Sequence, residues 1–195
     1  FNPYYAAHRA DDYCEGNAWQ YTWLVPHDME GYTQLFGGKE ACLARLDSLF
    51  IAPSTIEGDP SPDISGMIGQ FAHGNEPSHH ILYLYALLGQ PHKTAERVRE
   101  VMKTQYRDTP DGLSGNEDVG QMSSWYILSA MGIYEAEPAS GRYWFGSPLF
   151  DKVEIEVPGG VFTIRAENNS DRNRYIQGIT LNGKAYVKGY IRHED

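Results

Sequence analysis

The spacing of apolar residues changes once along the 195-residue chain, and this change constrains the fold most strongly. Across residues 18–134 apolar side chains recur every three or four positions, as in Leu43, Leu46 and Phe50, which is typical of amphipathic helices. From Asp151 onward they alternate with charged residues, which is the two-residue period of a β-strand. The chain is therefore predicted to be mainly α-helical, with a small β appendage at its end.

Gly- and Pro-rich stretches divide the helical part into antiparallel helical hairpins. These stretches lie at 37–38, 53–62, 89–91 and 109–115. Between them, helices are expected over 40–50 and 93–106.

Two β-hairpins are predicted after the helices. The first joins 153–157 to 162–166 through Pro158-Gly159-Gly160. The second joins the residues around 179–181 to 186–191 through Asn182-Gly183, a dipeptide favoured in two-residue hairpin turns. We expect the chain to end in a small antiparallel sheet.

Composition excludes several kinds of partner. There are 26 acidic and 16 basic side chains, and a net charge of −10 argues against nucleic acid because phosphate binding needs a basic face. No run approaches 18 apolar residues, so no membrane span is expected. Cys14 and Cys42 form neither a disulfide framework nor a zinc-binding spacing. Because the chain begins with Phe1, we interpret it as a piece of a longer polypeptide whose targeting signal lies elsewhere.

A short repeat is the most informative motif. Gly74-Asn75-Glu76 and Gly115-Asn116-Glu117 are the same tripeptide, and Glu15-Gly16-Asn17 uses the same residue types; each precedes a helical stretch. Because returning helices separate the three segments, we expect them to emerge at one end of the helical layer and to share a pocket. The alternative is that they are ordinary helix N-caps.

Carboxylates, amides and aromatic residues favour acid–base hydrolysis or metal binding by oxygen ligands. The motifs GxSxG, GxxxxGK[ST] and HExxH do not occur in the sequence. Glycoside hydrolysis needs one protonated and one ionised carboxyl, and Glu15 and Asp118 could form that pair. Asp118 and Glu117 repel each other, and either Asn116 or a divalent cation such as Ca²⁺ or Mg²⁺ would ease this repulsion.

Glu76 and His79 also form an ExxH pair, a motif found in di-iron helix bundles. Those bundles use two copies and further glutamates, whereas one copy is present here, so a di-iron site is the weaker hypothesis. His79 and His80 are adjacent and must point in different directions; we expect one of them to face the pocket.

The longest motifs resemble glycoside hydrolase family 92. They are EGNAWQYTW at 15–23, VPHD at 25–28, DISGMIGQ at 63–70, AHGNEPSHH at 72–80, GNEDVGQMS at 115–123, FGSPLFD at 145–151, NNS at 168–170 and TLNG at 180–183. The resemblance implies a calcium-dependent, inverting exo-α-mannosidase built from an N-terminal β-sandwich and a C-terminal (α/α)6 barrel. Residues 1–145 would then be part of the catalytic (α/α)6 barrel, and residues 146–195 a C-terminal antiparallel β-strand region.

The resemblance also implies roles for individual residues. Glu15 corresponds to the general acid and Asp118 to the general base, while Asn116 stands where some relatives have a second Asp that positions the water. Ca²⁺ would bind the mannose 2- and 3-hydroxyls. Its candidate protein ligands are Gln70, Asn75 and Glu76. Candidate sugar-binding residues are Trp19 as a stacking platform, His27, Asp28, His73, Glu76, His79 and Glu117.

The resemblance implies that the substrate is a mannose-containing oligosaccharide or N-glycan, with α-1,2-linked mannose expected. The expected partners are the rest of the same enzyme, namely its β-sandwich and first barrel helices, or a second copy that covers the exposed helical flanks in a homo-oligomer. The isolated chain is expected to be weakly active or inactive. Export to the periplasm or beyond is also implied. Two alternatives stay open: a non-catalytic carbohydrate-binding or assembly fragment, and an oxygen-ligated metal hydrolase acting on another substrate.

Overall fold

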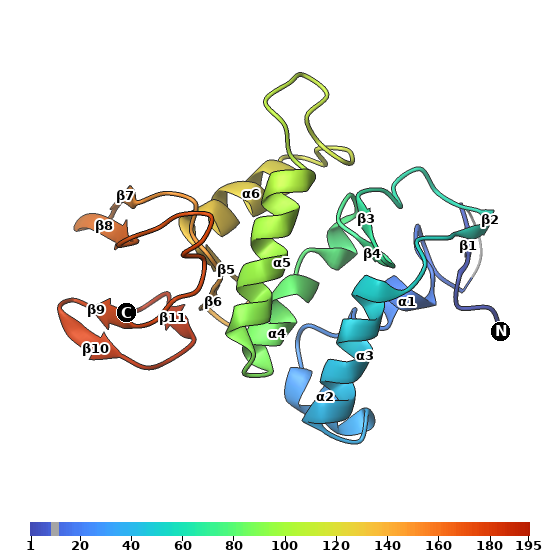
Figure 1. Cartoon of the computed structure of the whole chain (residues 1–195), viewed down its shortest axis with the longest axis horizontal. Helices are drawn as coiled ribbons and strands as arrows, with labels where there is room; N and C mark the ends of the chain where they lie inside the picture. The colour runs from blue at the N-terminus through green and yellow to red at the C-terminus, as the bar shows by residue number, and fades with distance from the viewer. Residues whose placement is uncertain (9–11) are drawn as a thin grey trace.

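The computed structural model describes residues 1–8 and 12–195 and shows a helical part in the middle of the molecule (Figure 1). The helices are α1 (Ala18–Tyr21), α2 (Met29–Leu35), α3 (Lys39–Ile51), α4 (Leu84–Leu87), α5 (Pro91–Thr104) and α6 (Gln121–Met131), with short 3-10 helices η1 (Glu76–Ser78) and η2 (Ile81–Tyr83). The helices expected over 40–50 and 93–106 are thus confirmed as α3 and α5. The second ends earlier than predicted, because Tyr106 instead forms a β-bridge with Leu113.

Residues 53–62 are not helical, as their Pro and Gly content predicts, but residues 63–75 are not helical either, which corrects the helical periodicity expected there. They contain the short strands β2 (Glu57–Asp59), β3 (Met67–Ile68) and β4 (Phe71–Ala72), and β2 pairs in parallel with β1 (Tyr5–Ala7). Gly66 and Gly69 have positive φ, which a helix cannot accommodate. Helices account for 31% of the chain, so the architecture is a mixture of helices and small sheets.

The strands near the C-terminal end form three separate small sheets. They are β5 (Ile133–Tyr134), β6 (Arg142–Phe145), β7 (Lys152–Val157), β8 (Gly160–Arg165), β9 (Ile179–Leu181), β10 (Lys184–Tyr186) and β11 (Tyr190–Arg192). The two predicted hairpins are confirmed as β7–β8 and β9–β10, and the second turns through Asn182 and Gly183 with φ of 49° and 77°. Strand β11 instead pairs with β6 in the sheet β11–β6–β5, so one sheet spans the predicted boundary at 145/146.

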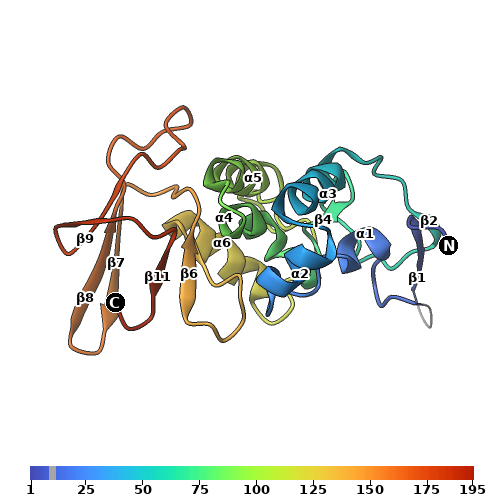
Figure 2. The ribbon, with the colours of Figure 1, turned by 90° about the horizontal axis from the view of Figure 1, so that it is seen from below.

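The core is built around a buried central segment, residues 78–86. Helix α4 and η2 contact α5, and the cluster also includes Leu46 of α3 and Trp125 of α6. In Figure 2, α3 and α5 lie side by side along one side of the helical part, with α4 and α6 on the other. A helical segment that is apolar on every face is stable only when it is covered all round.

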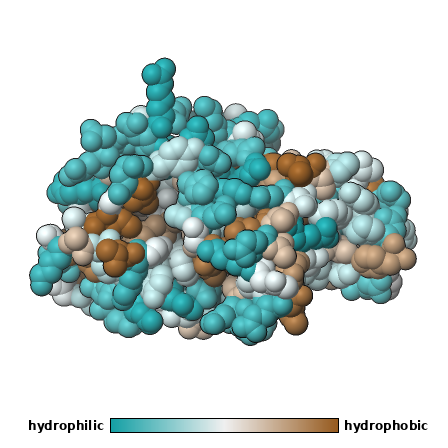
Figure 3. Space-filling model, turned by 60° about the horizontal axis from the view of Figure 1, so that its bottom comes forward, coloured by the Kyte–Doolittle hydropathy of each residue, from teal (hydrophilic) through white to brown (hydrophobic). Residues whose placement is uncertain are grey.

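The face shown in Figure 3 is mostly hydrophilic, with hydrophobic residues in separate patches. Exposed large apolar side chains include Leu35 on α2, Ile51 at the end of α3 and Val187 after β10. No helix among the described residues has the length and apolar character that crossing a bilayer requires.

Buried amides tie α1 to the loop after α3. The Gln70 side chain accepts a hydrogen bond from Asn17 Nδ2 at 2.9 Å and donates to the carbonyls of Pro53 and Thr55 at 2.6 and 2.8 Å. The Gln20 amide donates to the Gln70 carbonyl at 2.6 Å. Gln70 has no exposed surface, so this network fixes the start of α1 against the β3–β4 hairpin.

We predict that Gln70→Leu lowers the free energy of unfolding by at least about 3 kcal/mol, because it leaves several buried polar groups without partners. Urea unfolding monitored by circular dichroism measures this change. Gln34→Leu, at an exposed position of α2, is the control and should change stability little. Equal stability of the two variants would contradict a structural role for the Gln70 amide.

Candidate active site

The two identical tripeptides meet through their glycines. A Cβ built on Gly115 would overlap the carbonyl oxygen of Gly74 and lie 2.7 Å from its Cα, so only glycine fits at this contact. Gly66 packs against a side chain instead, with a built Cβ 2.7 Å from the Ser114 hydroxyl, and its carbonyl accepts from the His73 amide at 3.2 Å. In Figure 1 the β3–β4 hairpin and the loop between α5 and α6 lie toward the same end of the molecule. Three loops are therefore in backbone contact.

Three carboxyl groups gather beside this contact. Oε1 of Glu76 is buried and has no hydrogen-bond partner among the described residues. Burial raises the pKa of the Glu76 carboxyl, and the neighbouring carboxylates of Asp118 and Asp63 raise this pKa further. Asp63 is not among the predicted site residues; its place at the start of the DISGMIGQ motif is the only signal for it in the sequence.

Side-chain amides join the acidic segments. Asn75 Nδ2 donates to the backbone carbonyl of Glu15 at 3.0 Å, and Asn116 Nδ2 donates to Asp63 Oδ1 at 3.0 Å. The N-cap interpretation holds for Asn17, whose side chain accepts from the amide of Trp19 at the start of α1. Asn75 and Asn116 instead connect separate loops, so the three segments form one site.

The backbone is strained at Glu15 and Asp118, the two residues predicted to form an acid–base pair. Glu15 and Asp118 have φ of 52° and 51°, and Val119 follows with φ of 58°. Non-glycine residues seldom adopt this left-handed conformation, and a β-branched residue such as valine does so least readily. Such strain persists where surrounding contacts impose it, and it concentrates at functional sites.

Glu117 caps α6. Its Oε1 accepts from the backbone amide of Ser123 at 2.8 Å and its Oε2 accepts from the Ser123 hydroxyl at 2.6 Å. These hydrogen bonds lower the pKa of the exposed Glu117 carboxyl. Because both oxygens are used within the first turn of the helix, the expectation that Glu117 binds sugar is replaced by a capping role.

Trp19 is not a free stacking platform, contrary to expectation. Its ring is 8% exposed, with the Arg45 guanidinium 4.0 Å from the ring centroid and the Tyr4 ring at 5.8 Å. Stacking with a sugar requires an open aromatic face, and here the ring is already covered by neighbours.

The histidines lie beneath the site and not on its surface. His73 and His79 are 0% and 1% exposed, which corrects the expectation that they contact sugar. The His79 ring bonds through Nε2 to the His73 carbonyl at 3.0 Å and through Nδ1 to Gln121 Nε2 at 3.1 Å. His80 Nε2 bonds to the Trp23 carbonyl at 2.7 Å. The rings therefore connect the central segment to α1 and α6.

We predict that acid destabilises the chain through these rings. Burial lowers the pKa of His80 and lowers that of His79 to about 4, from an ordinary value of 6.5. As pH falls below 6.5 the unfolded chain binds protons that the folded chain does not, so the free energy of unfolding falls by at most about 1.4 kcal/mol per pH unit for each ring.

His80→Gln keeps a donor for the Trp23 carbonyl but cannot titrate, so urea unfolding between pH 6.5 and 5 should show a shallower pH slope. His92→Gln, at an exposed position of α5, should keep the wild-type slope. If His80→Gln also kept that slope, the buried ring would not be the source of the acid sensitivity.

We also predict that Gly115→Ala lowers the free energy of unfolding by about 1–3 kcal/mol, because its Cβ overlaps the Gly74 backbone and the loops must separate. Gly178→Ala is the matched control, since no atom lies within 4 Å of a Cβ built there. Thermal denaturation of both variants measures the difference. A Gly115→Ala variant as stable as the control would contradict the close contact.

His27 and Asp28 lie in a different place. Both are exposed, and Asp28 Oδ1 accepts from the Gly31 amide at 2.9 Å as the N-cap of α2. They line a hollow of about 620 Å³ together with Trp144 of β6, and none of the three site carboxyls lines this hollow. In Figure 1, α2 lies at the end of α3 opposite the β3–β4 hairpin. The structure thus separates these two predicted sugar-binding residues from the carboxyl cluster.

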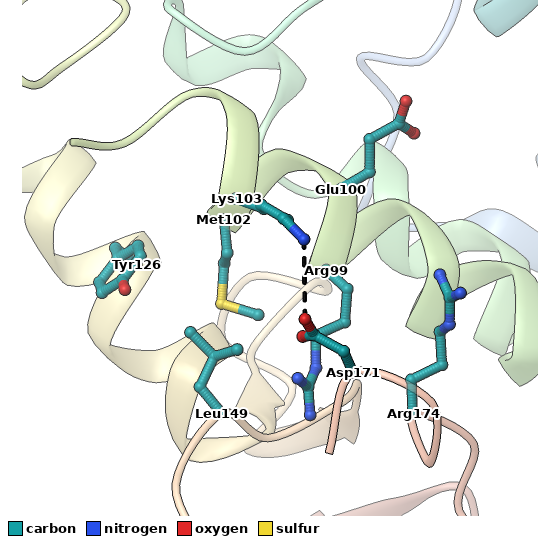
Figure 4. Close-up of a pocket in the computed structure, with 8 residues that line it drawn as sticks. All are labelled: Arg99, Glu100, Met102, Lys103, Tyr126, Leu149, Asp171 and Arg174. Atoms are coloured by element: carbon teal, nitrogen blue, oxygen red, sulfur yellow. Dashed lines mark ion pairs between the residues drawn. The ribbon is translucent and has the colours of Figure 1, made fainter.

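A second hollow, of about 440 Å³, lies over α5 and holds none of the predicted site residues (Figure 4). Lys103 and Asp171 form an ion pair of 3.6 Å across it. The guanidinium of Arg99 donates to Ser147 Oγ at 3.0 Å and to Asn169 Oδ1 at 2.5 Å. These contacts attach the segment after β8 to the helical part.

The carboxyl cluster offers oxygen atoms that could ligate a hard cation, whereas the buried amide network around Gln70 does not. Over residues 1–8 and 12–195, no three His, Cys, Asp or Glu side chains are arranged to ligate one metal ion. The buried Oε1 of Glu76 lacks a partner, and Asn75 uses its nitrogen for Glu15, which leaves its oxygen for another group. Both polar atoms of Gln70 are occupied, so we remove it from the candidate ligands. Oxygen atoms of this kind suit Ca²⁺ when further oxygen ligands are supplied.

Comparison with known proteins gives a match along the whole chain. The model of the glycosyl hydrolase family 92 catalytic domain matches residues 1–195. An uncharacterized secreted glycosidase from Arthroderma benhamiae is 34% identical over 184 residues, which cover 92% of this chain and 22% of that protein.

Two solved structures from Bacteroides thetaiotaomicron are also similar. One is a family GH92 α-mannosidase in complex with mannoimidazole, 39% identical with a TM-score of 0.91, covering 100% of this chain and 26% of that chain. The other is a family GH92 inverting mannosidase, 40% identical with a TM-score of 0.79, covering 95% of this chain and 27% of that chain. The chain thus spans about a quarter of the length of these relatives.

Proposed function

The chain belongs to glycosyl hydrolase family 92, and from this premise we propose that it supplies catalytic residues of an exo-acting α-mannosidase. The observation that carries the proposal is the carboxyl cluster where the two Gly-Asn-Glu segments meet. Two similar structures are described as mannosidases, one of them inverting and the other bound to mannoimidazole.

In the proposed mechanism Glu15 is the general acid and Asp118 the general base. Asp118 takes a proton from a water molecule as the water oxygen attacks the anomeric carbon. The glycosidic bond breaks, and its leaving oxygen takes the proton of Glu15. Attack from the face opposite the leaving group inverts the anomeric configuration, and an inverting pair stands about 6.5–9.5 Å apart to leave room for the water. Asn116 holds the water by hydrogen bonding.

We propose that Asn75 and Glu76 provide oxygen ligands for Ca²⁺. When bound, the cation would polarise the mannose 2- and 3-hydroxyls as a Lewis acid. Glu76 suits this role because its buried Oε1 lacks a partner, and a carboxylate without compensation is costly to bury. Asn75 adds a neutral oxygen while its nitrogen keeps Glu15 in place.

The proposed substrate is a mannose-containing oligosaccharide or N-glycan, cleaved at an α-1,2 linkage. Because the chain spans about a quarter of its relatives, we propose that other segments of a longer enzyme complete an (α/α)6 barrel and add a β-sandwich. They, or a second copy in a homo-oligomer, would cover exposed residues such as Leu35 and Ile51. A periplasmic or extracellular location agrees with the description of the fungal relative as secreted.

The first test is mannose release from α-1,2-mannobiose by the complete enzyme, followed by NMR with calcium and with a chelator. Calcium-dependent release with β-mannose formed first would support the proposal. First-formed α-mannose would contradict inversion. No release from any α-mannoside would overturn the activity and favour a non-catalytic carbohydrate-binding or assembly role.

Two substitutions separate the acid from the base. We predict that Asp118→Asn and Glu15→Gln each lower kcat on mannobiose by about 10²–10⁴-fold. An aryl mannoside with a good leaving group needs no protonation, so it should restore much of the rate of Glu15→Gln but not that of Asp118→Asn. Glu154→Gln, at an exposed position of β7, is the control. The opposite pattern of rescue would exchange the two assignments.

A further inference from the structure

Asp63 has no role in the mechanism proposed above, yet its carboxylate lies between the other loops of the site. Its Oδ2 accepts from the Ser61 hydroxyl at 2.6 Å, and Ser61 is buried. Its Oδ1 accepts from Asn116 Nδ2 at 3.0 Å. One oxygen therefore fixes the carboxylate to its own loop, and the other reaches across to the loop that carries Asp118.

The loop of Asp63 is firmly anchored. The Gly74 amide donates to the Ser65 carbonyl at 3.0 Å, and the His73 amide donates to the Gly66 carbonyl at 3.2 Å. These bonds hold the loop against the first Gly-Asn-Glu segment, where side chains are buried. The backbone of the loop that carries Asp63 is therefore held in place by hydrogen bonds.

The loop that carries Asn116 and Asp118 is less well anchored than the loop of Asp63. Asn116, Asp118 and Val119 are exposed, and the last two have left-handed backbones. A strained, exposed turn keeps its conformation only when contacts on its flanks impose it. The Asn116 amide is two residues from Asp118, so its bond to Asp63 acts on the strained turn directly.

We propose that Asp63 is a positioning residue, which fixes the Asn116–Asp118 turn through the hydrogen bond to Asn116 and thereby aims the Asp118 carboxylate. The inference rests on the proposed function, because Asp118 matters as the general base. The chemistry required of residue 63 is an acceptor oxygen, which an amide also provides. The negative charge of Asp63, which acts on Glu76, is not required for this role.

The test uses the complete enzyme and compares Asp63→Ala with Asp63→Asn. We expect Asp63→Ala to lower kcat on α-1,2-mannobiose at least ~10-fold with KM changed less than ~2-fold, while Asp63→Asn stays within ~3-fold of wild type. Asn116→Ala should lose at least as much activity as Asp63→Ala, because it removes the same bond together with the proposed hydrogen bond to water, and the double variant should be no slower than Asn116→Ala. Asp108→Ala, an exposed acid between α5 and α6, is the control.

Hydrogen exchange gives a readout that does not depend on turnover. Amides of residues 113–122 should exchange faster in Asp63→Ala and at the wild-type rate in Asp63→Asn. Wild-type kcat in Asp63→Ala, or additive losses in the double variant, would overturn the proposal. If Asp63→Ala does not fold, Asn116→Ala removes the same bond from the exposed side, and the exchange rates of its amides over residues 113–122 decide the question. If the wild-type enzyme cleaves no α-mannoside, the proposed function fails. If amide exchange in Asp63→Ala is the same as in the wild type, Asp63 does not hold the turn, whatever the activity of the enzyme.

Discussion

The backbone contact between Gly74 and Gly115 decides how the rest of the site is arranged. Where loops meet without side chains between them, the residues that follow are brought much closer than ordinary packing allows. Glu76 comes two residues after one of these glycines and Asp118 three residues after another, so carboxyl groups are gathered where like charges repel. Amide donors, and in our proposal a divalent cation, offset that repulsion.

The buried central segment, residues 78–86, stabilises this arrangement of loops. His79 and His80 lie in it, and each ring uses a nitrogen to bind a backbone carbonyl of another turn or helix. A neutral imidazole offers one donor and one acceptor, so it can link two elements inside a core at little cost in desolvation. The loops of the site are therefore held by a buried layer of the core.

Local sequence rules predicted the elements that local interactions determine. The helices α3 and α5 and the Asn182-Gly183 hairpin agree with periodicity and turn chemistry. Residues 53–75, by contrast, contain β2, whose partner β1 is distant in sequence, and the short β3–β4 hairpin, which has no clear two-residue period. Burial was the other gap: a motif letter shows that Trp19 or His73 is present, but tertiary packing decides whether solvent reaches it. The internal repeat located the acidic segments and the family resemblance suggested their roles, whereas Asp63 became visible only through its contact with Asn116.

The left-handed backbone at Val119 implies a trade-off between the stability of the protein and its turnover. Glycine or asparagine would adopt this conformation with less strain, so either substitution would relieve a local cost of about 1–3 kcal/mol. The same relief would let the neighbouring carboxylate sample more orientations. A laboratory selection for heat resistance alone would therefore favour changes at this position and erode turnover, and such a selection should include an activity screen from its first round.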